Sequence, residues 1–94
     1  MKTIHRYALE LTDARQTKEL PYGAEVLSAA IKPNESAISV WVLFEPYLGE
    51  PVNRTFRIIS TGHTITDDLE GFKFIDTVIH QIGGSTLCWH VFVK

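Results

Sequence analysis

The sequence predicts an all-β fold, a single small antiparallel sandwich or barrel of about seven strands over residues 1–94. Three observations predict it. In most apolar segments the hydrophobic side chains recur at every second position, which is the period of a strand. Turn residues such as glycine, proline, asparagine and aspartate interrupt these segments about every 8–12 residues. No segment combines the length and the period of a stable helix.

The first four strands follow from alternation and from the turns between them. Residues 4–11 place apolar side chains on one face, which is typical of a half-buried strand, and residues 16–20 form a short strand that ends at a proline. Residues 25–32 carry apolar side chains at period two. A helix over 24–30 remains the alternative, because alanine, glutamate and leucine favour helices. Residues 37–44 are apolar on both faces, so we expect this strand to be central or covered on both sides.

The last three strands are expected at residues 54–60, 72–82 and 85–93. The first of them alternates apolar with polar side chains. The other two are joined by a Gly-Gly pair, which is typical of a two-residue hairpin turn. Segment 64–71 is too short and polar for a strand or a full helix, and Thr66 is suited to cap a single helical turn there.

The two-residue turn fixes the register of the last hairpin, so that Val78 faces Trp89 and Thr77 faces His90. This register predicts two apolar faces. One holds Phe74, Val78, Leu87, Trp89, Val91 and Val93, and the other holds Ile75, Ile79, Cys88 and Phe92. A barrel corner or a covering loop explains the second face, and so does a homo-oligomer that buries it.

Composition excludes several classes of partner. The formal net charge is -2 and no cluster of lysine or arginine exists, so nucleic acid is not expected to bind. Cys88 is the only cysteine, which excludes an intrachain disulfide, fits a reducing compartment and is best explained as a small buried hydrophobe. We expect no signal peptide and no membrane partner, because no apolar run approaches the roughly 18 residues of a spanning helix.

Catalytic motifs are absent from the sequence. No spacing of cysteine, histidine or glutamate resembles a zinc site, and the hairpin register places His80 and His90 on opposite faces. No phosphate-binding glycine loop and no Gly-x-Ser-x-Gly elbow occurs. Asp67 and Asp68 suit a solvated loop or a helix cap better than a cation site. We therefore expect no enzyme, no metal and no cofactor, with an acid–base role of His63 as the remaining alternative.

Residues 54–63 bring two arginines on a strand next to a Thr-Gly-His turn, in which Gly62 is expected to need a positive φ. A guanidinium, turn N–H groups and an aromatic plane are what a nucleotide-like anion requires. The ligand-binding candidates are Arg54, Arg57, Thr61, Gly62 and His63, with Trp41 or Trp89 as a stacking surface. In the structural alternative, Arg57 pairs with a carboxylate such as Glu10 or Glu45 and the turn is only a turn.

Five motifs occur in order along nearly the whole chain. They are Met-Lys-Thr-Ile-His-Arg-Tyr-Ala-Leu at 1–9, Leu-Pro-Tyr-Gly-Ala-Glu-Val-Leu-Ser at 20–28, Trp-Val-Leu at 41–43, Arg-Thr-Phe-Arg-Ile followed by Thr-Gly-His within 54–63, and Gly-Gly-Ser followed by Trp-His-Val-Phe within 83–92. Together they resemble a family of small uncharacterised proteins from tailed-phage genomes, from which loop 46–53 departs. The resemblance implies a phage or prophage accessory protein made in the host cytoplasm, and it implies no activity.

Small phage β-proteins without enzyme motifs often act by binding, so by analogy we expect a non-catalytic phage accessory binding protein. It would counter host defence by sequestering a small anionic nucleotide-type immune signal or by blocking a host protein, and we expect a homo-oligomer. The alternative is a structural or assembly accessory protein that acts through homo-oligomerisation, using the outer apolar face of the last hairpin.

Overall fold

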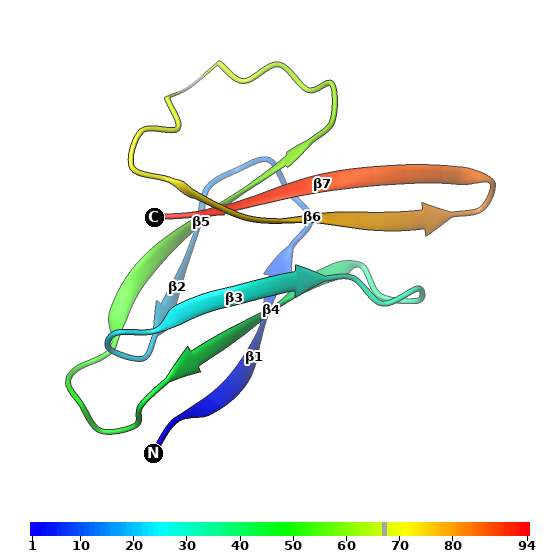
Figure 1. The fold of residues 1–94 in the computed structure, drawn as a ribbon. Helices are drawn as coiled ribbons and strands as arrows, with labels where there is room; N and C mark the ends of the chain where they lie inside the picture. The colour runs from blue at the N-terminus through cyan, green and yellow to red at the C-terminus, as the bar shows by residue number, and fades with distance from the viewer. Residues whose placement is uncertain (67) are drawn as a thin grey trace.

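Seven antiparallel strands form two sheets that face each other, so the expected all-β sandwich is confirmed (Figure 1). The computed structural model describes residues 1–66 and 68–94. The strands are β1 (Thr3–Glu10), β2 (Gln16–Leu20), β3 (Glu25–Ala30), β4 (Ala37–Phe44), β5 (Val52–Ser60), β6 (Lys73–Ile82) and β7 (Ser85–Val93). Every expected strand overlaps one of these. The described residues form no helix that could span a membrane.

The two sheets have the strand orders β1-β4-β3 and β2-β5-β7-β6, and every neighbouring pair is antiparallel. As expected from its apolar sequence, β4 lies in the middle of its sheet, and its side chains Ile38, Val40 and Val42 are fully buried. The helix alternative over 24–30 is wrong, because Glu25–Ala30 pairs along β4 as a strand with one bulge. Sheet pairing here overrides the helix propensity of the segment.

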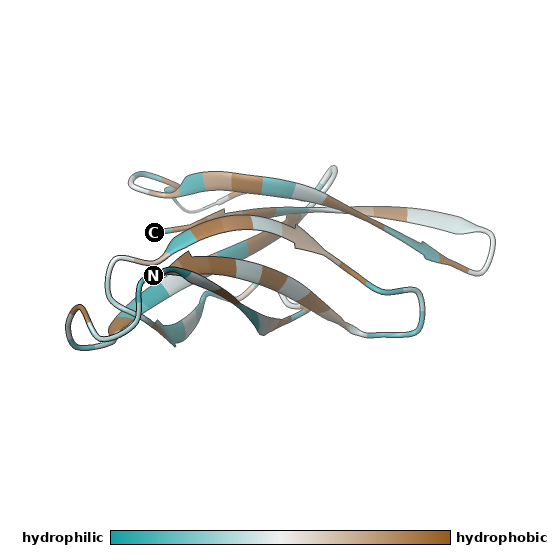
Figure 2. Ribbon diagram, turned by 60° about the horizontal axis from the view of Figure 1, so that its bottom comes forward, coloured by the Kyte–Doolittle hydropathy of each residue, from teal (hydrophilic) through white to brown (hydrophobic). Residues whose placement is uncertain are grey.

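The core lies between the two sheets. Figure 2 shows hydrophobic and hydrophilic residues alternating along the strands, which directs one set of side chains inward. Phe56 and Leu9 are the largest fully buried side chains, and burying one such side chain contributes about 1.5–3 kcal/mol. The core consists of Leu9, Leu20, Val26, Ala29, Ile38, Val40, Val42, Phe44, Phe56, Ile58, Val78, Val91 and Val93.

The hairpin of β6 and β7 has the expected register from its turn as far as the pair Asp76–Val91. A bulge at Ile75 then shifts the pairing by one residue. The expected faces of Phe74 and Ile75 are therefore wrong: Phe74 pairs with Phe92, with ring centroids 5.6 Å apart, whereas Ile75 packs against the core. Strict alternation predicts the wrong face for these two side chains because the bulge inserts one extra residue into β6 and none into β7.

The two edges where the sheets meet are closed in different ways. At one edge β3 lies beside β6, and Asp76 Oδ2 accepts a hydrogen bond of 3.1 Å from the N–H of Ala29. At the other edge, the side-chain amide of Gln16 at the start of β2 bonds the backbone of Glu10 at the end of β1. Farther from that bridge, a pocket lies between the first half of β1 and the end of β2.

The segment between β5 and β6 contains no helical turn among its described residues, so the expected cap at Thr66 is not formed by the part of the chain that the structure shows. Asp68 Oδ1 accepts a hydrogen bond of 2.8 Å from the N–H of Glu70, which is the geometry of a local turn. Asp67, the other half of the expected Asp-Asp loop or cap, lies outside the described residues.

Candidate functional site

The Thr-Gly-His segment forms a tight turn after β5. The N–H of His63 donates to the carbonyl of Ser60 at 3.1 Å, and the N–H of Thr61 donates to the carbonyl of Cys88 on β7 at 3.1 Å. Gly62 has φ 85°, so the expected positive φ is confirmed and the turn is of type II. Both of these turn N–H groups therefore donate within the protein.

Arg57 and His63 converge on one residue, Asp13, in the loop between β1 and β2. Arg57 is buried, and its Nε donates to the backbone carbonyl of Asp13 at 3.2 Å. His63 Nε2 lies 3.4 Å from Asp13 Oδ2, and both side chains are about half exposed. The guanidinium and the imidazole thus lie in the same region, as the sequence predicts. Asp13, in the loop between β1 and β2, contacts both of them. An external anion that bound His63 here would compete with the Asp13 carboxylate.

Thr61, the expected hydroxyl ligand, belongs to a hydrogen-bonded row of three side chains, Thr61, His90 and Thr77, on the outer face of the four-stranded sheet. Its Oγ1 forms a 2.7 Å hydrogen bond with Nε2 of His90, and Thr77 Oγ1 forms a 3.0 Å hydrogen bond with Nδ1 of the same ring. His80 is buried on the other face of β6, as the hairpin register predicts. The described residues contain no group of three histidine, cysteine, aspartate or glutamate side chains arranged to hold a metal ion.

The other expected ligand residues make different contacts. Arg54 donates from Nε to the carbonyl of Lys94 at 3.0 Å and from Nη1 to the carbonyl of Ala24 at 3.2 Å, which ties β5 to the start of β3. Trp41 is in β4 of the other sheet, opposite Arg6. Trp89 packs against the core, and its buried Nε1 has no hydrogen-bond partner among the described residues. Trp89 pairs with Ser60 directly before the turn, but its side chain packs against the core, and Trp41 lies in the other sheet.

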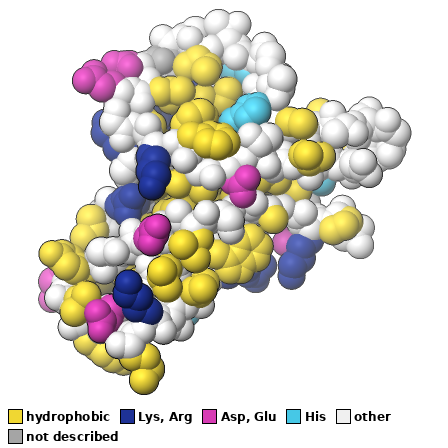
Figure 3. Space-filling model, in the orientation of Figure 1, with side chains coloured by type: hydrophobic (Ala, Val, Ile, Leu, Met, Phe, Trp, Pro, Cys, Tyr) yellow, Lys and Arg dark blue, Asp and Glu magenta, His cyan; other side chains and the backbone are white. Residues whose placement is uncertain are grey.

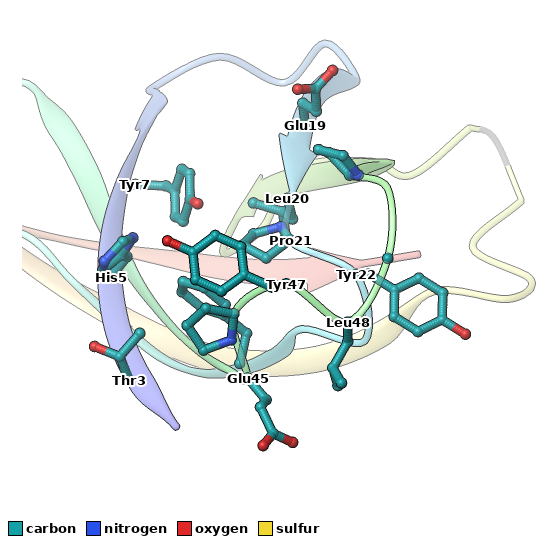
Figure 4. A pocket seen from close by; sticks show the side chains of 14 residues that line it. Thr3, His5, Tyr7, Glu19, Leu20, Pro21, Tyr22, Glu45, Tyr47 and Leu48 are labelled. Atoms are coloured by element: carbon teal, nitrogen blue, oxygen red, sulfur yellow. The ribbon is translucent and has the colours of Figure 1, made fainter. Parts of the chain in front are cut away.

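A pocket of about 520 Å³ opens between β1 and β2, at the end of the sandwich opposite the Thr-Gly-His turn (Figure 4). Figure 4 shows Tyr7 projecting from β1 toward Leu20 and Tyr47, with His5 and Thr3 farther along the same strand. The His5 and Phe44 rings meet edge to face with centroids 4.9 Å apart. The lining includes His5, Tyr7, Leu20, Pro21, Phe44, Pro46, Tyr47 and Pro51.

Exposed apolar side chains surround the mouth of this pocket. Tyr47 is fully exposed, and Tyr22 and Leu48 are about half exposed. Figure 3 shows hydrophobic side chains gathered at the lower left of the molecule, over the loops between β2 and β3 and between β4 and β5. Tyr47 is the one described non-glycine residue with a positive φ, 66°. Gly49 lets the same loop pass close to the Tyr22 ring, since a Cβ there would lie 2.9 Å from its Cγ.

The charges at the pocket are negative. Glu19 and Glu45 lie on opposite sides of it in Figure 4, and no lysine or arginine is among its lining residues. Glu45 Oε1 lies 3.0 Å from the N-terminal ammonium group, so this rim already accepts a cation. The sequence alone predicts only a loop at residues 45–51. The signal that was present is a Tyr-Leu pair placed between two prolines at 46–51, because a simple surface connection does not need large apolar side chains.

The family model of DUF7352, a domain of unknown function, matches the chain over residues 1–94. No curated protein and no solved structure matches the chain.

Proposed function

Because the chain belongs to the DUF7352 family, which carries no assigned activity, we propose its role from its own surface: a non-catalytic binding protein that docks a segment of another protein in the pocket between β1 and β2. The single observation that carries this proposal is Tyr47. It is fully exposed at the pocket mouth and is held at a positive φ. Both features cost free energy, and neither contributes to the core.

The energetic argument favours a binding role for the aromatic rim. A left-handed backbone conformation costs a residue other than glycine about 1–2 kcal/mol. Tyr47, Tyr22 and Leu48 leave a large apolar surface in contact with water, and such patches are typical of interaction sites. Tyrosine is also enriched among the residues that contribute most to protein–protein binding, because it buries a large area at low entropic cost.

The proposed setting is that of a phage or prophage accessory protein acting in the host cytoplasm, where it counters defence by blocking a host protein. The support is the resemblance of motifs at 1–9, 20–28, 41–43, 54–63 and 83–92 to small tailed-phage proteins. Fold and surface are compatible with this role, and the partner's chemistry follows from the pocket: aromatic and proline side chains with carboxylates at the rim.

Site-specific photo-crosslinking tests this proposal. A photoreactive phenylalanine analogue replaces Tyr47, and in a matched control it replaces Thr86, which is also exposed but lies near the hairpin tip. During expression in the bacterial host, the Tyr47 position should give a discrete adduct with a host protein that Tyr22→Ala suppresses, and the Thr86 position should not. Equal adducts from both positions, or none from Tyr47, would contradict docking at this pocket.

A second candidate is sequestration of a small anionic nucleotide-type signal at the Arg57–His63 corner. The specific observation that favours it is that both side chains contact Asp13: Arg57 Nε donates to its backbone carbonyl, and His63 Nε2 lies 3.4 Å from its carboxylate. A ligand at a hundredfold excess over Kd stabilises a protein by about 2.7 kcal/mol, so cyclic nucleotides and ADP-ribose derivatives should raise Tm. Asp13→Ala should strengthen that shift and His63→Ala should weaken it. Unchanged Tm with the whole panel counts against this candidate.

The assembly alternative depends on the outer face of the β6–β7 hairpin, where Phe74 and Ile79 are exposed. A homo-oligomer would bury this apolar surface. Light scattering on the purified chain and on Ile79→Glu tests it: an oligomer that the charge dissociates supports assembly, and a monomer at high concentration removes it.

A further inference from the structure

The outer edge of β1 is available for strand pairing. Among the described residues, β1 pairs with β4 and with no other strand. At its end, Gln16 Nε2 donates to the carbonyl of Glu10 at 2.9 Å, and the N–H of Glu10 donates to Gln16 Oε1 at 2.9 Å. A side-chain amide thus makes the two bonds that a peptide group of a neighbouring strand would make. The Glu10 backbone groups therefore point into the seam between β1 and β2, where Gln16 already pairs with them.

Alternation identifies the next pairing positions along this edge. In an antiparallel strand, every second residue directs both N–H and C=O to the same side. Glu10 directs its groups away from β4, so Ala8, Arg6 and Ile4 do the same, while Tyr7 and His5 direct theirs toward β4. The side chains of Tyr7 and His5 point toward the pocket instead. The edge therefore offers three pairing residues directly beside the aromatic pocket.

Edge strands of this kind are normally protected by proline, by bulges or by inward-pointing charge. β1 contains no proline, and its pairing with β4 runs without a bulge from Thr3 to Glu10. The charged side chain of Arg6 turns toward β4, where its Nη1 donates to Ser39 Oγ at 3.2 Å. An unprotected edge next to a pocket is the arrangement used by domains that bind extended peptides as an added strand.

We infer that an extended segment of a partner protein adds to the three-stranded sheet beside β1, along Ile4 to Ala8, and places a lysine or arginine side chain in the aromatic pocket. This inference rests on the proposed docking function and names its occupant. A strand in that position directs alternate side chains into the pocket. Tyr7 and Tyr47 supply ring faces for a cation, and Glu19 and Glu45 supply the complementary charge.

A second copy of the same chain is a poorer occupant. If β1 paired with β1 of another copy, the side chains entering the pocket would be Thr3, His5 and Tyr7, which include no lysine or arginine. Like carboxylates would also meet across the seam, because each copy carries Glu19 and Glu45 at its own rim. Charge complementarity therefore favours a basic peptide from a different protein.

Hydrogen exchange by NMR on the full chain tests the inference directly. The probe is a short capped peptide of alternating threonine and valine with one central arginine, and its control carries neutral citrulline instead. The arginine probe should slow exchange at the amides of Ile4, Arg6 and Ala8 by about tenfold, the effect of one net hydrogen bond each. The amides of His5 and Tyr7, which face β4, serve as internal controls and should not change.

Two further probes distinguish strand pairing from simple pocket binding. In each probe, N-methyl groups replace the amide hydrogens of every second residue, which blocks one edge of the extended peptide. The two probes are methylated on alternate sets of residues, so they block opposite edges. Strand addition requires that one of them binds and the other fails, whereas pocket binding alone is indifferent to the choice. Tyr47→Ala should weaken binding of the arginine probe without unfolding the protein, because this side chain is fully exposed.

The outcomes separate this inference from the proposed function. If the arginine probe binds in a Tyr47-dependent way but Arg6 and Ala8 exchange as before, strand addition is wrong and docking at the pocket stands. If no probe binds while the photo-crosslinked adduct forms at Tyr47, the inferred occupant is wrong. If the citrulline probe protects the same amides equally well, the inference that a basic side chain occupies the pocket is wrong. Protection without any probe, together with a dimer in light scattering, identifies a second copy as the occupant.

Discussion

Asp76 ties the two sheets together where β3 meets β6, so Asp76→Ala should lower the free energy of unfolding by about 2 kcal/mol. Its Oδ2 accepts a partly buried hydrogen bond of 3.1 Å from Ala29, and its Oδ1 accepts an exposed one of 2.9 Å from Thr77. Water replaces the exposed bond at little cost. Loss of the partly buried one leaves the N–H of a buried residue unpaired, and a bond to a charged acceptor contributes about 1.5–3 kcal/mol.

Urea denaturation and thermal unfolding measure this effect. For a domain of this size, each kcal/mol corresponds to roughly 4–8 °C in Tm, so we expect a decrease of about 8–16 °C. Asp76→Asn keeps an acceptor and should lose about half as much. The matched control is Asp68→Ala, which removes an exposed carboxylate bond to the N–H of Glu70. If Asp76→Ala and Asp68→Ala cost the same, Asp76 does not hold the two sheets together.

Three further predictions concern the pocket and the turn. Leu20→Ala should lower stability by about 2–5 kcal/mol in urea titration, because this fully buried side chain lies at the pocket floor; a smaller loss would indicate that the site collapses. Tyr47→Gly should raise stability by up to about 1 kcal/mol while weakening docking, and a decrease would refute the strain at φ 66°. Gly62→Ala should cost about 1–2 kcal/mol at φ 85°, whereas Gly84→Ala, without a positive φ, should cost less.

Much of the fold could be predicted from the sequence because its signals are local. Alternation marks a strand wherever one face is buried, and all seven expected strands are present. The Gly-Gly turn determines which residues of β6 and β7 face each other near the tip, since a two-residue loop allows one register. The positive φ of Gly62 could be predicted for the same reason, because the conformation of a tight turn depends on the residues within it.

The candidate sites were only partly predictable. The nearness of Arg57 and His63 follows from their position on either side of one turn, whereas their shared partner Asp13 comes from a loop far away in sequence. The pocket combines β1, the end of β2 and the loop after β4, so no window of sequence contains it. The sequence shows a tyrosine at position 47, but only the structure shows that its side chain is fully exposed.

The sequence by itself determined the strands and the tight turns, because these depend on neighbouring residues. Only the tertiary structure decided which strands share a sheet, where the bulge at Ile75 reverses two side chains, and that the edges of β1 and β2 stay apart beside an aromatic pocket. The physical reason is that these features arise from packing between segments distant in the chain. Many pairings satisfy the same alternation, and only the complete set of side chains selects one.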